Sequence, residues 1–126
     1  MSNAPTKSLL SLIELGGYPD FRPLYERLGY EVITEFSARR AQARLREFTP
    51  DVIVADFYKR YFHDRVSNLE SVLALKSRLP HTRIIVLYEP IHQSDIDHLR
   101  QRCPLDAALP LPVTERVLEA ALTPAG

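Results

Sequence analysis

The sequence predicts a single α/β domain in which helices cover both faces of a parallel sheet. Three apolar runs, at residues 8–14, 50–56 and 83–88, have the length and composition of buried strands. Segments with apolar residues at helical spacing alternate with the strands, and the connections are short. Such alternation favours parallel strands, because each helix carries the chain back across the sheet. A chain of 126 residues is long enough for one domain with a substantial core.

The first half of the chain contains the signals that begin and end its elements. Gly16-Gly17 breaks the first apolar run, and Pro23 fits a helix only within its first turn. Asp20 is expected to cap that helix and Ser37 to cap the next, because both side chains can accept a hydrogen bond from a free backbone N–H group. The expected order is strand 8–14, helix 20–29, strand 30–36, helix 38–48 and strand 50–56.

The second half repeats this alternation. Ser67 or Asn68 is expected near the start of the next helix, Pro80 after its end, and Ser94 as the cap of the helix that follows. The expected order is helix 66–79, strand 83–88, a helix from Ser94 to Cys103, strand 106–111 and helix 114–122. The apolar residues expected on the buried sides of the last two helices are Ile96, Leu99, Cys103, Val117, Leu118 and Leu122.

Composition limits the possible functions and compartments. Sixteen Lys and Arg residues balance 16 Asp and Glu residues, so the net charge does not favour nucleic acid or an anionic membrane as partner. A single cysteine and the lack of a signal peptide or membrane-spanning run lead us to expect a cytoplasmic protein. We expect a flexible N-terminus at 1–7, the folded domain at 8–122 and a C-terminal tail at 123–126. Both a stand-alone protein and a domain of a longer one remain open.

Asp56 is the first candidate for a functional residue. It ends the apolar run PDVIVAD at residues 50–56, and the carboxyl ends of parallel strands are where ligands and chemistry collect. Two interpretations remain open from the residues. Asp56 is either a reactive acid or a structural carboxylate that bonds to loop N–H groups or to a nearby Lys or Arg.

The order and spacing of three segments resemble those of a response-regulator receiver domain, the CheY-like family. The segments are GYEV at residues 29–32, PDVIVAD at 50–56 and RIIVL at 83–87, and the resemblance extends over residues 8–122. It implies a flavodoxin-like fold with five parallel strands in the order 2-1-3-4-5. In that family, the aspartate at the position of Asp56 accepts a phosphoryl group from a histidine kinase with the help of Mg²⁺.

Other positions depart from the family pattern. The acidic pair that helps to hold the metal is replaced by Ile13 and Glu14, so one acid remains. Tyr88 replaces the Ser or Thr of the fourth strand, Leu111 replaces the lysine that pairs with the phosphate, and Ala108 replaces the aromatic switch residue. Phosphoryl transfer depends on such cations and donors. We therefore expect a degenerate receiver, or pseudo-receiver, with no cofactor and at most weak Mg²⁺ binding.

The first connection also departs from the family. The loop at residues 15–19 is longer, and the helix that ends near Leu28 is about one turn shorter. This difference would reshape the region beside Glu14.

An aromatic and basic segment follows Asp56 and is a candidate interaction loop. Its members are Phe57, Tyr58, Lys59, Arg60, Tyr61 and Phe62. Contact with a protein partner is favoured over nucleic acid, because the rest of the chain has no basic excess. Packing of some aromatics over the sheet edge is the structural alternative. Lys59 or Arg60 could replace the missing cation, but a flexible loop would position it poorly.

The function expected from the resemblance is a phosphorylation-independent interaction module in signal transduction. No nucleophile or metal arrangement of an enzyme is present in the sequence, and Cys103 is expected in the core. Receivers commonly dimerise through the fourth helix, fifth strand and fifth helix. The candidate residues for that face are Asp95, Asp97, Arg100, Arg102 and Glu115. A phospho-accepting receiver, a small-ligand sensor with Tyr88 as its wall and a nucleic-acid adaptor that uses Arg60 and Tyr61 remain as alternatives.

Overall fold

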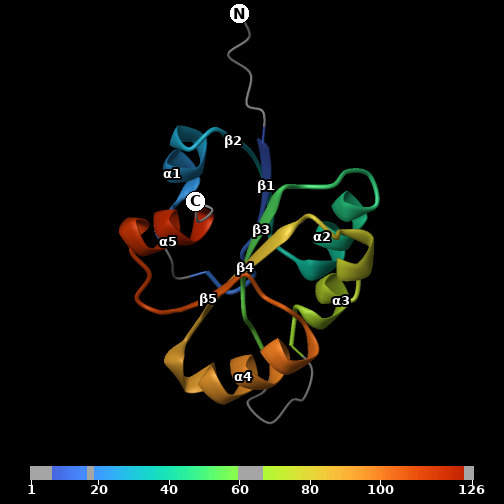
Figure 1. Ribbon diagram of the computed structural model, residues 1–126, viewed down its shortest axis with the longest axis vertical. Helices are drawn as coiled ribbons and strands as arrows, with labels where there is room; N and C mark the ends of the chain where they lie inside the picture. The colour runs from blue at the N-terminus through green and yellow to red at the C-terminus, as the bar shows by residue number, and fades with distance from the viewer. Residues whose placement is uncertain (1–6, 17–18, 60–66, 124–126) are drawn as a thin grey trace, which may run out of the picture.

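Five parallel strands form a central sheet with the order β2-β1-β3-β4-β5, as the sequence predicts. This computed structural model describes residues 7–16, 19–59 and 67–123. Figure 1 shows the sheet between two layers, with α1 and α5 on one side and α2 and α3 on the other. The strands are β1 (Lys7–Leu12), β2 (Tyr30–Glu35), β3 (Val52–Asp56), β4 (Arg83–Tyr88) and β5 (Ala107–Pro110).

The helices connect successive strands across the faces of this sheet. The α-helices are α1 (Arg22–Arg27), α2 (Ala38–Leu45), α3 (Glu70–Leu73), α4 (Gln93–Arg102) and α5 (Glu115–Leu122). The short 3₁₀ turns η1 (Lys76–Arg78) and η2 (Pro90–His92) follow α3 and precede α4, respectively. No helix in the described part of the chain is both long and apolar enough to cross a membrane.

The sheet separates two hydrophobic clusters because side chains alternate between its faces. Leu10 and Ile53 point to the cluster beneath α2, α3 and α4, whereas Leu9 and Val54 point to the cluster beneath α1 and α5. All five residues of β3 are buried. A parallel strand that is covered on both faces must be apolar throughout, and this explains the continuous run in the sequence.

Of the predicted helix caps, Ser37 is confirmed, and Asp20 and Ser94 are wrong. Ser37 accepts a hydrogen bond from the N–H of Arg40, and the Thr114 hydroxyl serves α5 in the same way. Asp20 accepts the N–H of Arg22, but the N-cap position of α1 is Phe21. Ser94 lies inside α4, because η2 already turns the chain into helical geometry before Gln93.

The helix expected over residues 66–79 is the main error of the fold prediction. The described part of this segment contains only the four residues of α3, followed by η1. Asn68 does not cap a helix; its side chain bonds instead to the backbone of Asp56 and Tyr58. Residues 67–69 therefore lie outside the helix, which begins at Glu70.

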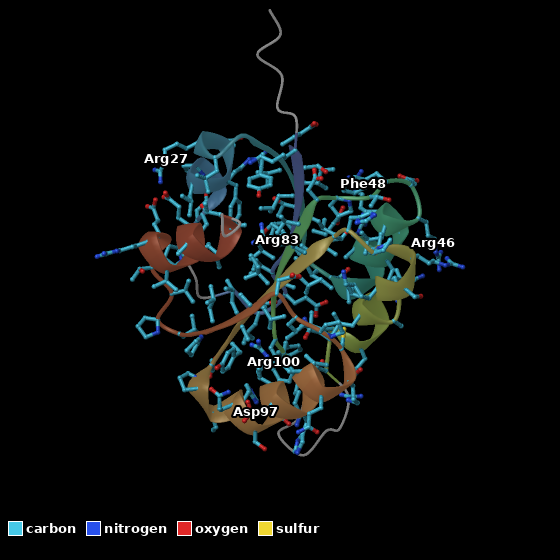
Figure 2. All side chains as sticks on the ribbon, viewed as in Figure 1. Arg27, Arg46, Phe48, Arg83, Asp97 and Arg100 are labelled. Atoms are coloured by element: carbon cyan, nitrogen blue, oxygen red, sulfur yellow. The ribbon has the colours of Figure 1, made fainter. Side chains whose placement is uncertain are left out.

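Three side chains near the C-terminal end refine the prediction. Val117 is 46% exposed, because Leu118 and Leu122 alone form the buried side of α5. Cys103 is half-buried at the end of α4 and packs against the larger core. The Arg83 guanidinium, labelled in Figure 2, donates to the carbonyl oxygens of Ala121 and Leu122 and so fixes the end of α5 to β4.

The expected chain ends are only partly covered by the described ranges. Lys7 is already paired with Tyr30 in the sheet, so the ordered domain begins one residue earlier than expected. Residues 1–6 and 124–126 lie outside the described residues, and their flexibility remains a prediction.

Candidate functional site

Asp56 is fully buried at the carboxyl end of β3 and is held by the loop that follows β1. Its Oδ1 accepts the backbone N–H of Glu14 at 2.9 Å. Its Oδ2 accepts the N–H groups of Leu15 at 2.9 Å and Gly16 at 3.2 Å. The carboxylate thus binds three consecutive backbone donors, an arrangement that satisfies a buried negative charge without a metal or a cationic side chain. This geometry agrees with the structural interpretation, in which Asp56 is a carboxylate that bonds to loop N–H groups.

Gly16 allows the third of these hydrogen bonds. Its φ angle of +83° lies in the left-handed region, where residues with a Cβ atom are strained. Its N–H can therefore turn toward Asp56 directly after that of Leu15. The sequence marks Gly16 only as part of a break after the first strand, and no pattern in it indicates the bond to Asp56.

Glu14 does not face Asp56 with its side chain. Its carboxylate accepts the N–H of Ala38 at the start of α2. Burial raises the pKa of Glu14, the hydrogen bond from Ala38 opposes this shift, and the charge of Asp56 adds to it. Ile13 packs into the cluster beneath α1 and α5. The resemblance assigns Ile13 and Glu14 to a pair of metal ligands. In the structure, Glu14 instead bonds to the start of α2, and Ile13 packs against the core.

The donor set at this edge does not fit Mg²⁺. A hard divalent cation needs several oxygen ligands that are free to converge, whereas both oxygens of Asp56 and one of Glu14 already accept backbone N–H groups. Within the described ranges, no group of three or more His, Cys, Asp or Glu side chains lies close enough together to hold a metal.

The residues at the ends of β4 and β5 form a closed, largely apolar edge. Tyr88 is 3% exposed, and its hydroxyl donates to the side chain of Gln93. The N–H of Leu111 donates to the carbonyl of Tyr88 at 2.9 Å, and the Leu111 side chain packs beneath α1 and α5. Ala108 packs against the opposite cluster. The structure thus brings Tyr88 and Leu111 together through their backbones, and neither adds a positive charge.

The comparisons with known proteins agree with this architecture. No family model and no curated protein sequence matches the chain. Solved structures of receiver domains do match it. A receiver domain protein from Methanospirillum hungatei has a TM-score of 0.75 and 18% identity, with 92% of this chain and 90% of that one covered. A receiver domain protein from Clostridium thermocellum has a TM-score of 0.73 and 20% identity, with 91% and 90% covered.

The chain has the CheY-like receiver fold. The protein TrrA from Thermotoga maritima has the same fold, with a TM-score of 0.65 and 20% identity over 92% of this chain and 96% of that one. It was solved in complex with Mg²⁺ and BeF. The carboxylates at the corresponding edge of the present receiver fold are bonded to its own backbone instead.

The candidate interaction loop of this receiver fold is only partly described. Phe57 is 5% exposed, and its ring centroid lies 5.2 Å from that of His92, so its assignment to a contact surface is wrong. Asn68 fixes the loop by accepting the N–H of Tyr58 at 2.7 Å and donating to the carbonyl of Asp56 at 2.8 Å. No pattern in the sequence indicates this role for Asn68. Arg60, Tyr61 and Phe62 lie outside the described residues.

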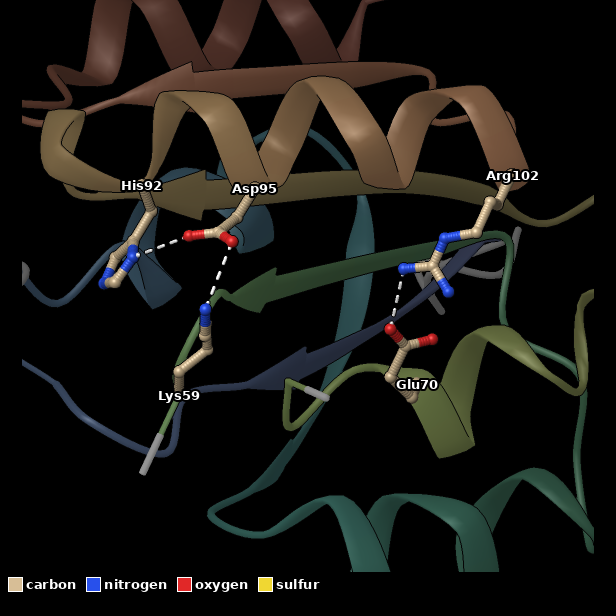
Figure 3. A network of polar contacts seen from close by, with 5 residues as sticks. All are labelled: Lys59, Glu70, His92, Asp95 and Arg102. Carbon is tan, nitrogen blue, oxygen red and sulfur yellow. Dashed lines mark hydrogen bonds and ion pairs between the residues drawn. The ribbon is translucent and has the colours of Figure 1, made fainter. Parts of the chain in front are cut away.

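Lys59 is not the flexible cation that the sequence suggests. Its side chain is 7% exposed, and its Nζ lies 3.1 Å from Oδ1 of Asp95 on α4 (Figure 3). His92 approaches the other oxygen of Asp95 at 3.2 Å. Burial raises the pKa of Asp95, but the hydrogen bonds and charges of Lys59 and His92 outweigh it and hold the pKa below its ordinary value. This cluster ties the loop after β3 to α4.

The five residues expected on one dimer face lie on three different surfaces. Asp95 binds Lys59, and Arg102 pairs with Glu70 on α3 at 2.8 Å, so both face the α3 side of α4 (Figure 3). Glu115 lies 3.7 Å from Arg27 on α1. Only Asp97 and Arg100 remain exposed on the opposite flank of α4, where Figure 2 labels them far from Arg27. The other three residues form ion pairs within the chain, and their place on a dimer face remains a prediction.

Proposed function

We propose that this chain is a receiver-fold interaction module of signal transduction that works without phosphorylation of Asp56. The main observation behind this proposal is that both oxygens of Asp56 accept backbone N–H groups while the side chain is fully buried. An oxygen that accepts these bonds is a poorer nucleophile, and its attack on a phosphoryl group would require the loop at residues 14–16 to open.

The surroundings of Asp56 add little stabilisation for a transferred phosphoryl group. Transfer requires fixed positive charge and hydrogen-bond donors where negative charge develops. Lys59 is committed to Asp95, Tyr88 donates to Gln93, and Leu111 is apolar. The proposal therefore includes no enzymatic activity and no cofactor, and any binding of Mg²⁺ is expected to be weak. The single cysteine supports a cytoplasmic location.

Intact-mass analysis after incubation with acetyl phosphate and Mg²⁺ tests this proposal. We expect no phosphoryl adduct on the wild-type chain, while a conventional receiver in the same reaction gains one. Asp56→Asn is the matched control, because it keeps the shape of the side chain and removes the acceptor. A mass gain in the wild type that disappears in Asp56→Asn would favour a phospho-accepting receiver over the proposed module.

The partner that we propose is a second copy of the chain, bound through the exposed flank of α4. Asp97 and Arg100 carry opposite charges three residues apart. A twofold axis can therefore place Asp97 of each copy beside Arg100 of the other. Val117 is exposed on the side of α5 that faces away from Glu115 and Glu119, which pair with Arg27, and adds apolar surface.

Charge reversal tests this interface by sedimentation. Arg100→Asp is expected to shift a dimer to monomer by placing two acids opposite each other, and the double variant Asp97→Arg with Arg100→Asp is expected to restore the dimer. Arg46→Asp, at the exposed residue that follows α2, is the control for the same charge change elsewhere. A wild type that is monomeric at millimolar concentration, or a double variant that fails to recover, contradicts the proposed partner.

A further inference from the structure

A cavity of about 500 Å³ lies beside α1, at the carboxyl ends of β1 and β2. Its volume is within the range of small-molecule sites in proteins. The helix α1 begins only at Arg22. An additional turn at its start would cover this region beside β2, and without that turn the cavity is open. Figure 1 shows α1 as a short helix beside β2. Asp56 and Tyr88 are not among the residues that line this cavity.

The floor of the cavity contains two hydroxyl groups on an otherwise apolar face of the sheet. Ser11 and Thr34 are register partners of β1 and β2, one step beyond the apolar pair Leu9 and Val32 on the same face. Ser11 is only 8% exposed. Neither side-chain hydroxyl makes a hydrogen bond to another residue in the described ranges. Two such groups at the floor of a concave site are available to a ligand.

Aromatic rings supply the walls. Phe21 and Tyr25 come from the start of α1, and Phe36 follows β2. Phe36 is 72% exposed, although the ring carries a large apolar area that favours burial. A flat aromatic ligand would cover this ring. Tyr25 adds a third hydroxyl without a hydrogen bond in the described part of the chain, and burial followed by the charge of Asp20 raises its pKa, so the phenol stays neutral and can donate.

The charged side chains at the rim of the cavity are Asp20 and Arg22. One oxygen of Asp20 accepts the N–H of Arg22 at 3.0 Å. The Arg22 guanidinium is turned to Glu26, with 3.4 Å between Nε and the carboxylate. Glu26 lies outside the lining, but its ion pair offsets the charge of Arg22, so the carboxylate of Asp20 favours an amine or a hydroxyl over a carboxylate at the rim.

From this arrangement, we propose that the cavity beside α1 binds a small planar aromatic molecule that carries an amine or hydroxyl group. The ring packs against the exposed side chain of Phe36 and the small exposed parts of Phe21 and Tyr25, and the polar group bonds to the hydroxyl floor or to Asp20. Asp56 does not line this site, although the lining residue Ile13 directly precedes Glu14, whose N–H binds Asp56.

Three indole probes that differ only in the polar group test the proposal. Tryptamine ends in an ammonium, tryptophol in a hydroxyl and indole-3-acetate in a carboxylate. In ¹⁵N-labelled protein titrated with each probe, we expect saturable amide shifts centred on Ser11, Thr34 and Tyr25. Affinity should fall in the order tryptamine, tryptophol, indole-3-acetate. Absence of saturable binding by every probe at millimolar concentration overturns the proposal, and so does tightest binding by indole-3-acetate.

Matched variants separate this site from weak binding elsewhere. Thr34→Val removes a hydroxyl with little change in volume and should weaken binding of tryptophol by about threefold to tenfold. Thr49→Val makes the same change at an exposed position outside the cavity and should leave affinity unchanged. Asp20→Asn should weaken tryptamine but not tryptophol, whereas Asp97→Asn on α4 should affect neither.

Ser11→Ala provides a second route if Thr34→Val perturbs the sheet. Its amide spectrum outside the cavity should match that of the wild type, and tryptophol binding should again be weakened. Unchanged binding in a folded Ser11→Ala or Thr34→Val protein, together with unchanged tryptamine binding in Asp20→Asn, overturns the assignment of the site.

Discussion

At the scale of single residues, Asp56 is a structural anchor whose removal should be costly. Asp56→Ala leaves three partly buried N–H groups without their acceptor, and we expect the free energy of unfolding to fall by about 3 kcal/mol. Asp56→Asn keeps one acceptor oxygen but places an NH₂ group toward other donors, so a loss of about 1–2 kcal/mol is expected. Urea denaturation monitored by circular dichroism measures both.

Asp51→Asn is the control for this prediction. Asp51 accepts the N–H of Ser8 at an exposed position near the opposite end of β3, and its replacement should cost less than about 1 kcal/mol. If Asp56→Asn instead stabilises the protein, repulsion with Glu14 outweighs the loop hydrogen bonds and the anchoring role is wrong.

The Asp95 cluster should make stability depend on pH in the acidic range. Because the folded state holds the pKa of Asp95 below its ordinary 3.8, the ionised group adds stability above that value. The added stability is lost as the pH falls through the lower, folded pKa. We therefore expect the stability difference between wild type and Asp95→Asn to be constant from about pH 7 to 5 and to shrink below the ordinary pKa.

Urea denaturation at a series of pH values measures this difference. Asp97→Asn is the matched variant, since it removes the same charge from the exposed flank of the same helix without touching Lys59. A difference between wild type and Asp95→Asn that stays constant to about pH 2.5 contradicts the role of the Lys59 and His92 contacts.

The sequence identified Asp56 as the central residue but could not identify its partners. The position of Asp56 at the end of a strand can be predicted from a local pattern, because the apolar run at residues 50–56 ends in a carboxylate. The bonds of Asp56 to the N–H groups of Glu14, Leu15 and Gly16 join residues 42, 41 and 40 positions apart. Such partners depend on how loops pack after the sheet forms, and no periodicity encodes that.

At the scale of elements, strands were easier to predict than the helix after β3. β4 was confirmed at both ends, because an uninterrupted apolar run buried on two faces has few alternatives. Leu69, Val72 and Leu73 have the helical spacing that predicts a long helix, and all three are buried. The side chain of Asn68 nevertheless bonds to the backbone of Asp56 and Tyr58 and does not cap the helix, so spacing predicted which residues are buried but not where the helix begins.

The short α3 should be the least protected helix of the larger cluster. A four-residue helix contains few internal hydrogen bonds, and the chain passes directly into η1. In native-state hydrogen exchange, we expect amides of residues 73–75 to exchange faster than those of residues 97–102 in α4. Exchange of the two segments at equal rates would mean that α3 opens only with the whole domain.

At the scale of the whole molecule, the two clusters on either side of the sheet should unfold together. Leu9 and Leu10 are both fully buried, but they point to different clusters. Leu9→Ala and Leu10→Ala should each cost about 2–5 kcal/mol, because each leaves a cavity in close-packed surroundings. Both variants should keep one cooperative transition, since the same strands form the floor of both clusters.

Fluorescence and circular dichroism followed through the same urea series check this cooperativity. Leu15→Ala, at a 53% exposed position, is the control and should be nearly neutral. Separate transitions from the two probes in either variant would show that one layer can melt while the other remains folded.

The half-buried Cys103 makes the wild-type chain a ready-made probe of its own motions. It is the only thiol in the sequence and ends α4, the helix that the Lys59 cluster holds against the loop after β3. Burial raises the pKa of this thiol, which slows its reaction with a maleimide dye in the closed state. The labelling rate then reports how often the end of α4 lifts away, with no engineered cysteine and no second site to block.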